Sequence, residues 1–383
     1  MGFTIKTNTK LAVTKEVTEG AYLAPTAGTD FIEVLEDGVS LMPGREILEQ
    51  KTLGMGLAAK KGRLGLKSAT GEFSSFMKAG STEGSAPESD VLIESLLGSK
   101  HSQVELTSTS SHSTSVIYLS STGSLAVNDV VVVKQAGAYH ASPIKTVTAN
   151  TSIELVIPMS APPANNVKIA ALTSYVPANS DHPSFSVSKY VEDAILEQAS
   201  GCKTTSMSLE NFTTGQLASL SFSIEGLDFD RSISAPTYTP SYDTSETPVI
   251  VEACIYQDGN KIDVNEFSLS VENTLSFITN TCAGKESSRV TARKVSGSIN
   301  PYKQDNSVAN FTKFNSGNTF SLFVRAYNPT ATAGEGKEWI SFYMPKCMIT
   351  ELGEGDVDGV LTDTLSFNAT SSDGTAEIVV CFS

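Results

Sequence analysis

The sequence has few charged residues and no cysteine or histidine pattern typical of a metal or redox site. Charged residues make up 18% of the 383 residues, and the formal net charge is −15. The five cysteines form no C-x-x-C pair, and none of the four histidines has metal-ligand spacing to a cysteine or carboxylate. We therefore expect reduced thiols, as in a protein made in a cytosol, and neither metal nor cofactor.

Further absences limit the function. The acidic balance disfavours a protein that holds nucleic acid by its phosphates, because such a protein needs a basic surface. No apolar run approaches the roughly 18 residues of a membrane-spanning helix, and residues 1–17 lack the apolar segment of a signal peptide. No G-x-S-x-G and no complete phosphate-binding or dinucleotide-binding motif occurs. We therefore expect neither enzyme activity nor membrane contact.

Residues 353–359 have the composition of a calcium-binding loop, with Asp356 and Asp358 among glycines. The glutamate that such a loop carries at its twelfth position is missing. Glycine beside aspartate is also typical of tight hairpin turns. We favour a hairpin turn here over a calcium site.

A spacing that occurs twice suggests an internal duplication. Cys202 lies 18 positions before Leu220, and Cys347 lies 18 positions before Leu365, an offset of 145 between the copies. Both segments end in Leu-Ser-Phe and alternate apolar with polar residues in the same phase. The predicted buried residues are Ala218, Leu220, Phe222, Ile224, Leu365 and Phe367. The predicted polar faces are Ser219, Ser221, Ser223 and Glu225 in the first copy, and Thr364, Ser366 and Asn368 in the second.

A predicted strand and helix precede each of these segments. In the first copy Ser85 and Glu88 form a capping box, Pro87 lies in the first turn, and Gly98 ends the helix. Its predicted inward face is Leu92, Ile93, Leu96 and Leu97. In the second copy Asp305 or Asn306 caps a helix that ends at Gly317, with Val308 and Phe311 inward.

The two copies differ by an insertion. Pairing the strand at Gly71 with the strand at Thr291 gives an offset of 220, which exceeds 145 by 75. Several short apolar runs separated by turn residues fill residues 101–178, so the insertion is predicted to be a small all-β sandwich or barrel.

We therefore predict a mainly β protein with two tandem β-sandwich or barrel units, each with one flanking helix. Residues 31–100 and 179–230 form the first unit, and residues 101–178 form the inserted β domain. Residues 231–248 are a proline-containing linker, and residues 249–383 form the second unit. Residues 1–30 are polar and are predicted to be an extended N-terminal arm rather than core.

Two long hairpin loops are predicted, at residues 51–68 and 280–288. Long loops inside compact domains are usually functional or mobile. Their candidate functional residues are Lys60, Lys61, Arg63 and Lys67 in the first loop, and Lys285 and Glu286 in the second.

The ordered set of motifs resembles the major tail tube proteins of long-tailed, siphovirus-type bacteriophages, in the variety with two tube domains. The resemblance rests on Glu72-Phe73-Ser74-Ser75-Phe76, Gly84-Ser85-Ala86-Pro87 with Leu96-Leu97, Gly201-Cys202-Lys203, Leu220-Ser221-Phe222 and Arg293-Lys294-Val295-Ser296-Gly297-Ser298. It covers most of residues 31–100 and 180–383, and the inserted domain departs from the minimal pattern.

The resemblance implies a structural virion protein, made in the bacterial host cytoplasm, that assembles into stacked rings. These rings form the tail tube through which DNA is ejected. Three copies of a two-unit chain would close a ring of pseudo-sixfold symmetry, and a hexamer is the alternative. Implied partners are further copies, tape measure protein and DNA in the lumen, and tail terminator and tail-tip proteins. The polar faces would line the lumen, and the loops would reach the next ring.

Alternative interpretations remain open from the sequence. An adhesin or carbohydrate-binding β-protein fits the low charge and the extra β domain, but the missing signal peptide and unpaired cysteines oppose it. A tail terminator or adaptor would have the same fold and stop at one ring. The polar faces could also meet outside solvent, as in any two-sided antiparallel sheet.

Overall fold

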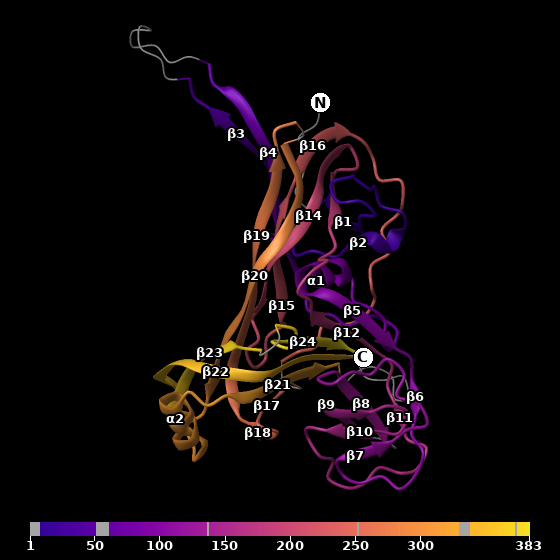
Figure 1. The fold of residues 1–383 in the computed structure, drawn as a ribbon, viewed down its shortest axis with the longest axis vertical. Helices are drawn as coiled ribbons and strands as arrows, with labels where there is room; N and C mark the ends of the chain where they lie inside the picture. The colour runs from indigo at the N-terminus through magenta and orange to yellow at the C-terminus, as the bar shows by residue number, and fades with distance from the viewer. Residues whose placement is uncertain are drawn as a thin grey trace.

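Strands dominate the structure, and the prediction of a mainly β fold is confirmed (Figure 1). The computed structural model describes residues 8–50, 61–135, 138–250, 253–282, 284–328, 338–371 and 374–383. In this part of the chain, 18 strands join in one large sheet and six form a small second sheet. The described part of the chain also contains two α-helices, α1 (Asp90–Leu97) and α2 (Asn306–Ser316).

The large sheet contains strands from both halves of the chain. Those before residue 250 are β1 (Thr9–Lys15), β2 (Phe31–Ile32), β3 (Val39–Leu48), β4 (Arg63–Phe76), β5 (Gly98–Gln103), β12 (Leu172–Pro177), β13 (Phe185–Val191), β14 (Ile195–Glu210), β15 (Ser219–Gly226) and β16 (Asp228–Ile233). Those after it are β17 (Cys254–Gln257), β18 (Asn260–Ile262), β19 (Val264–Asn280), β20 (Gly284–Pro301), β21 (Phe320–Tyr327), β22 (Trp339–Val357), β23 (Val360–Ala369) and β24 (Val379–Phe382).

Eight of these strands lie side by side in the order β3, β4, β15, β14, β19, β20, β23, β22. We call them the eight-strand sheet. Every neighbouring pair is antiparallel. The middle pair, β14 with β19, joins a strand from before residue 250 to one from after it, so a single sheet runs through both halves of the chain.

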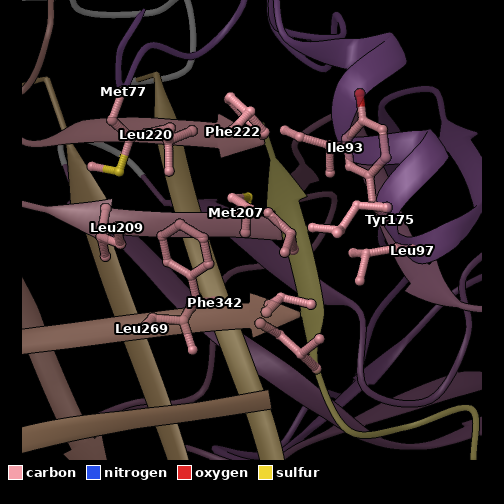
Figure 2. Close-up of a cluster of buried hydrophobic side chains, with 14 of the residues drawn as sticks. Met77, Ile93, Leu97, Tyr175, Met207, Leu209, Leu220, Phe222, Leu269 and Phe342 are labelled. Carbon is pink, nitrogen blue, oxygen red and sulfur yellow. The ribbon is translucent and has the colours of Figure 1, made fainter. Parts of the chain in front are cut away.

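One face of the eight-strand sheet is buried, because apolar residues alternate with polar ones along its strands. A row of directly paired residues crosses the sheet on this face: Phe73, Phe222, Met207, Val271, Val295, Ala369 and Cys347. Figure 2 shows Ile93 and Leu97 of α1 in the same cluster as Phe222. The predicted buried residues are confirmed: Ala218, Leu220, Phe222, Ile224, Leu365 and Phe367.

Helix α1 begins later than predicted. Ser85 and Glu88 do not form a capping box; instead the Ser85 hydroxyl donates to the carbonyl of Thr82, at 2.6 Å. The Glu88 carboxylate accepts from the backbone N–H of Glu33, at 2.9 Å, so it ties two loops together. The end of the helix at Gly98 is confirmed, with a left-handed φ of 98°. The predicted inward residues are buried: Leu92, Ile93, Leu96 and Leu97.

Helix α2 has the predicted limits, between Asp305 and Gly317, but not the predicted orientation. Val308 and Phe311 are 72% and 52% exposed, so the prediction that they point inward is wrong. The reason is a difference in covering elements. Strands β1, β5, β12 and β14 pack against α1. Among the described elements, α2 packs mainly on β22.

The polar N-terminal segment is not a free arm in its described part, residues 8–30. Strand β1 pairs with β13 and β2, and Leu11 and Val13 belong to the main core. The prediction failed because lysines flank this short apolar run and mask it in the sequence. Residues 1–7 lie outside the described residues.

An ion pair between the buried Lys203 and Glu19 ties the N-terminal segment to both halves of the large sheet. Lys203 on β14 is 3% exposed, and its Nζ lies 3.1 Å from a Glu19 carboxylate oxygen and 2.6 Å from the carbonyl oxygen of Ser288 on β20. The same Glu19 oxygen accepts from the Ser288 backbone N–H at 2.6 Å and its hydroxyl at 2.9 Å. Each buried polar group thus has a partner, as burial of a charge requires.

The small sheet forms a closed barrel within the region predicted as an inserted β domain. Its strands, in spatial order, are β6 (Leu106–Thr107), β11 (Lys168–Ile169), β8 (Val130–Gln135), β9 (Ala138–Thr148), β10 (Ser152–Leu155) and β7 (Val116–Tyr118). A bridge between Ser108 and Leu119 joins the two ends of this order, so the barrel leaves little open edge. At the ends of the region, β5 and β12 pair with each other in the large sheet.

The cysteines of the described residues are all free thiols. Cys202, Cys347 and Cys381 are buried, and burial raises the pKa of the Cys381 thiol to about 12. Cys282 is exposed. The buried thiols therefore stay protonated and act as small apolar residues.

A buried carboxylate fastens the barrel to the large sheet. Asp129, just before β8, is 0% exposed and accepts from the Ser174 hydroxyl of β12 at 2.7 Å. Its other oxygen lies 2.9 Å from Nε2 of His101 on β5. This hydrogen bond is the main reason that the pKa of His101 is raised above its usual value.

We predict a pH-dependent stability that comes from this contact. A raised folded-state pKa of His101 stabilises the protein fully below about pH 6.5, the ordinary value. The stabilisation is lost as pH rises through the raised pKa. The amount is on the order of 1 kcal/mol or less, because solvent screens the partly exposed ring. This contribution is measured by thermal unfolding of the wild type and the His101→Gln variant. The measurements run from about pH 5.5 to about pH 8.5, which brackets the ordinary pKa of histidine.

The difference between the two unfolding midpoints is the quantity to compare. His140 and His182 have pKa values lowered mainly by burial, so they contribute the opposite slope in both proteins and cancel in the difference. A difference that does not shrink with rising pH contradicts the charged pairing of His101 with Asp129.

Candidate assembly surfaces

The face of the eight-strand sheet opposite the core carries a row of small polar side chains. Directly paired residues in antiparallel strands point to the same side. On this side the row reads Ser74, Ser221, Ser208, Ser270, Ser296 and Asn368. It spans six strands, crosses the β14–β19 pair and ends at Met348 on β22. Both halves of the chain therefore contribute to one polar surface.

The charged residues beside this row are mostly acidic. Glu72, Glu210 and Glu272 are exposed on the same side, and Lys294 is the basic residue paired with Glu272. Serine hydroxyls bond to one another across strands, as between Ser74 and Ser221 at 3.1 Å. The surface therefore presents hydroxyl and carboxylate groups with little positive charge.

Most of the polar residues singled out from the sequence lie on this surface. Six of them are partly exposed: Ser221, Ser223, Glu225, Thr364, Ser366 and Asn368. Ser219 differs, because it is only 3% exposed between Phe76 and Glu210. The sequence reasoning missed the contributions of β4, β14, β19 and β20. Their alternation of serine with apolar residues was the available signal, for example around Ser208 and Ser270.

The seam between β14 and β19 has a defined register. Met207 pairs with Val271, and Leu209 pairs with Leu269, so apolar side chains meet on the core face. Ser206 pairs with Glu272 on the polar face. The two halves of the chain are thus joined by the same antiparallel pairing that joins strands within each half.

The eight-strand sheet ends in two open edges. Within the described residues, β3 pairs with β4 alone, and residues 348–357 of β22 pair with β23 alone. Open edges expose unpaired N–H and C=O groups that can pair with another chain. Exposed methionines lie at both edges: Met42 is 60% exposed and Met348 is 37% exposed. Both point to the polar face, since Met42 lies two residues from Ser40, the partner of Glu72.

The first predicted loop is shorter than expected, because β3 and β4 continue into a projecting hairpin. Arg63 and Lys67 lie in β4 rather than in a loop, and Lys67 Nζ lies 2.8 Å from the carboxylate of Asp228. Lys61 is exposed beside the strand, and Lys60 lies outside the described residues. Figure 1 shows this hairpin reaching beyond the body of the molecule. We call residues 44–48 and 61–67 the arm.

The second predicted loop is also mostly strand. Lys285 and Glu286 lie in β20, which begins at Gly284. The Lys285 ammonium sits 4.0 Å from the centre of the Phe277 ring, and burial lowers its pKa. Glu286 accepts from the side-chain amide of Asn280, so both charged residues are engaged within their own hairpin.

The segment of residues 353–359 forms a hairpin, as predicted. Val357 pairs with Val360, and Asp358 and Gly359 form the turn with positive φ values of 50° and 83°. Two consecutive positive φ values are typical of a tight two-residue hairpin turn. Among the described residues no group of three or more histidine, cysteine or acidic side chains is placed to hold a metal ion.

The continuous sheet, its polar face and its open edges define a β-rich structural protein. The family model of phage tail tube proteins matches residues 6–369, and the chain belongs to this family. The protein is therefore a structural component of the phage tail tube, located in the tail of the virion. No curated protein matches the chain. In the described residues, no helix has both the length and the apolar character needed to cross a membrane.

Proposed function

We propose that the protein forms closed rings that stack into the tail tube, and that the polar face of the eight-strand sheet lines the channel for DNA. The single observation that carries this proposal is the β14–β19 seam. The seam joins the two halves edge to edge. The strands left at the outer edges, β3 and β22, would be the counterparts of β19 and β14, the two strands of the seam.

The strand pairings support a duplication of one unit. Phe222 pairs with Phe73 in the first half, and Phe367 pairs with Gly297 in the second. Phe222 and Phe367 are 145 positions apart, as in the predicted repeat, and Phe73 and Gly297 are 224 apart. The offset predicted from the sequence for these two strands is 220 residues. The difference of four residues keeps the same face buried, because side chains alternate with a period of two.

One part of the predicted repeat does not follow the pairings. Cys347 pairs with Ala369, and the position equivalent to Ala369 in the first half is Ile224. Ile224 pairs with Thr204, not with Cys202. The matching cysteines are therefore two residues out of register, while the Leu-Ser-Phe strands are equivalent.

The seam supplies a register for the contact between chains. By the equivalences above, β22 corresponds to β14, and β3 corresponds to β19. The seam pair Met207–Val271 then corresponds to Ile349 of one chain and Leu41 of the next. The pair Ser206–Glu272 corresponds likewise to Met348 and Met42. Apolar side chains would meet on the core face, and both open edges would be paired.

Repetition of one head-to-tail contact closes a ring when its rotation divides a full turn. Each chain supplies two units, so three chains give a ring of six units with pseudo-sixfold symmetry. A ring of six chains is the alternative outcome. The hydroxyl-rich and acidic face suits a channel wall, because it carries few of the basic residues that would hold phosphates by counterion release. Tape measure protein and DNA would occupy the lumen, and terminator and tip proteins would meet the tube ends.

We predict that a variant with both Met42→Cys and Met348→Cys forms cross-links between neighbouring chains. The double variant is made with Cys282→Ser, which removes the exposed native thiol. Directly opposed residues in an antiparallel pair have Cβ atoms about 5 Å apart, within reach of a disulfide or a short bis-maleimide. Denaturing gel electrophoresis after oxidation should show dimers and trimers, and a ladder that stops at three chains.

Single-cysteine variants and a Met42→Cys, Val104→Cys pair are the matched controls, since Val104 is 75% exposed on the inserted region. A ladder to six chains would establish the hexameric alternative. Absence of inter-chain products from assembled protein would contradict the edge-to-edge ring.

We also predict that the polar face is shielded in assembled tubes. A cysteine at Ser366, half-exposed on the polar face, should react slowly with a large polyethylene-glycol maleimide in tubes and rapidly after disassembly. A cysteine at Ser110, exposed on the barrel, should react rapidly in both states. Gel shifts over time measure the rates. Equal rates at the two positions in tubes would place the polar face outside the channel.

A further inference from the structure

Arg325 is a partly exposed cation that makes no ion pair within the described residues. It lies on β21, between β17 and β22. Its Cζ atom lies 5.2 Å from the centre of the Tyr256 ring on β17, and 5.2 Å from the centre of the Trp339 ring on β22. Arg293, by contrast, is paired with the carboxylate of Glu377. Cation–π contacts from two sides therefore hold the Arg325 guanidinium in place of a carboxylate.

Two buried N–H donors of this cluster have no hydrogen-bond partner in the part of the chain that the structure describes. They are Nε of Arg325 and Nε1 of Trp339, and Trp339 as a whole is 3% exposed. Buried donors without a partner are rare in native proteins, so each requires an explanation. Arginine and tryptophan side chains carry donors and no acceptor. The group that satisfies them must therefore be an acceptor, and the charge of the guanidinium selects an anion.

The cluster lies where the inserted barrel meets the large sheet. Trp339 belongs to the apolar cluster that joins β21, β22 and β24 to β8 and β9, and Tyr256 packs against it. Burial lowers the pKa of His140 on β9, and the charge of Arg325 lowers it further, so the guanidinium lies near the barrel. Nε2 of His140 is already engaged, since it donates to the carbonyl oxygen of Ile157 at 2.8 Å. The junction thus places one cation among aromatic side chains.

The main core separates this cluster from the polar face. Side chains alternate along a strand, so Val324 and Ile340, the neighbours of Arg325 and Trp339, point the opposite way. Both belong to the main core. The cluster therefore faces away from the channel of the proposed function, and an anion reaches it from outside that channel.

The free part of the guanidinium suits a tetrahedral oxyanion. Nε of Arg325 is buried, whereas the residue as a whole is partly exposed, so its two terminal nitrogens are the donors left for a ligand. These N–H groups form a fork that matches two oxygens of a phosphate or carboxylate. The indole N–H of Trp339 adds a third donor. A phosphoryl group offers three strong acceptor oxygens, whereas a carboxylate has only two.

We propose that Arg325 and Trp339 form a binding site for a phosphoryl group at the junction of the barrel and the large sheet. The terminal nitrogens of Arg325 donate to two oxygens of the ligand, and the indole N–H of Trp339 donates to the third. Tyr256 holds the guanidinium from the other side. The ligand is free phosphate or the phosphoryl group of a larger molecule. All of these residues belong to one chain, so the site does not depend on the proposed ring.

The chain has a single tryptophan, so the fluorescence of Trp339 reports on this site directly. The full-length protein is titrated with sodium phosphate at constant pH and ionic strength. We expect a saturable change in emission, and none when sodium chloride replaces phosphate. A parallel titration with glycerol phosphate distinguishes the two sources. Tighter binding of glycerol phosphate identifies the phosphoryl group of a larger molecule, and tighter binding of inorganic phosphate identifies the free ion.

Arg325→Lys tests the guanidinium, because it keeps the charge but loses the fork and its ring stacking. We expect its affinity for phosphate to fall about tenfold or more, since a lysine makes no bidentate contact. Arg231→Lys is the matched control. It makes the same substitution at an arginine that is already paired with Glu197, and it should titrate like the parent.

Trp339→Phe supplies a second, independent test, because it keeps an aromatic ring but removes the donor. Bound ligand stabilises the folded state, so phosphate should raise the unfolding midpoint of the parent more than that of Trp339→Phe. The general stabilising effect of phosphate salts acts on both proteins and cancels in the comparison. The same comparison is made for Arg325→Lys.

The inference is overturned if phosphate gives no saturable change in the parent, or if chloride reproduces that change. It is also overturned if Arg325→Lys titrates like the parent, which would mean an adventitious ion only. Equal rises in the unfolding midpoints of the parent and Trp339→Phe would remove the indole from the site. Failure of the Met42–Met348 cross-link contradicts the ring and leaves this site unaffected, so the two proposals fail separately.

Discussion

The antiparallel pairing of β14 with β19 is the interaction on which the rest of the structure depends. It places Met207 against Val271 and Leu209 against Leu269, so the two halves share one core. Because strand pairing aligns side chains row by row, the seam also aligns the serines of both halves on the opposite face. Without it, each half would expose two edges and a separate polar face. With it, a chain has one inner seam and two outer edges.

The distribution of charge follows from this arrangement. Small hydroxyl side chains fill the row from Ser74 to Asn368, and the nearby exposed charges are mainly carboxylates. Lys294 is opposed by Glu272 on this face, whereas Lys203 is buried against Glu19 and Lys67 pairs with Asp228. A surface of this composition offers few positive charges to a polyanion.

The two helices differ in how far other elements cover them. Helix α1 is covered by β1, β5 and β12, all from the first half, and its inward residues Leu92, Ile93, Leu96 and Leu97 are buried. Among the described elements, α2 packs mainly on β22, and it ends at Gly317 with a left-handed φ of 67°. Phe311 and Phe314 of α2 are 52% and 38% exposed, and contiguous exposed apolar side chains of this kind mark interaction sites.

Local patterns in the sequence determined the strands, the alternation that buries Phe222 and Phe367, the helix end at Gly98 and the Asp358-Gly359 turn. These features depend on side-chain periodicity and on glycine's access to positive φ, which act over a few residues. The sequence could not locate the cover of α2, the burial of β1 or the length of the arm, because these depend on residues far away in the chain. Only the tertiary structure decided that β14 lies beside β19, since strand pairing uses backbone groups that every residue carries and that no side-chain pattern specifies.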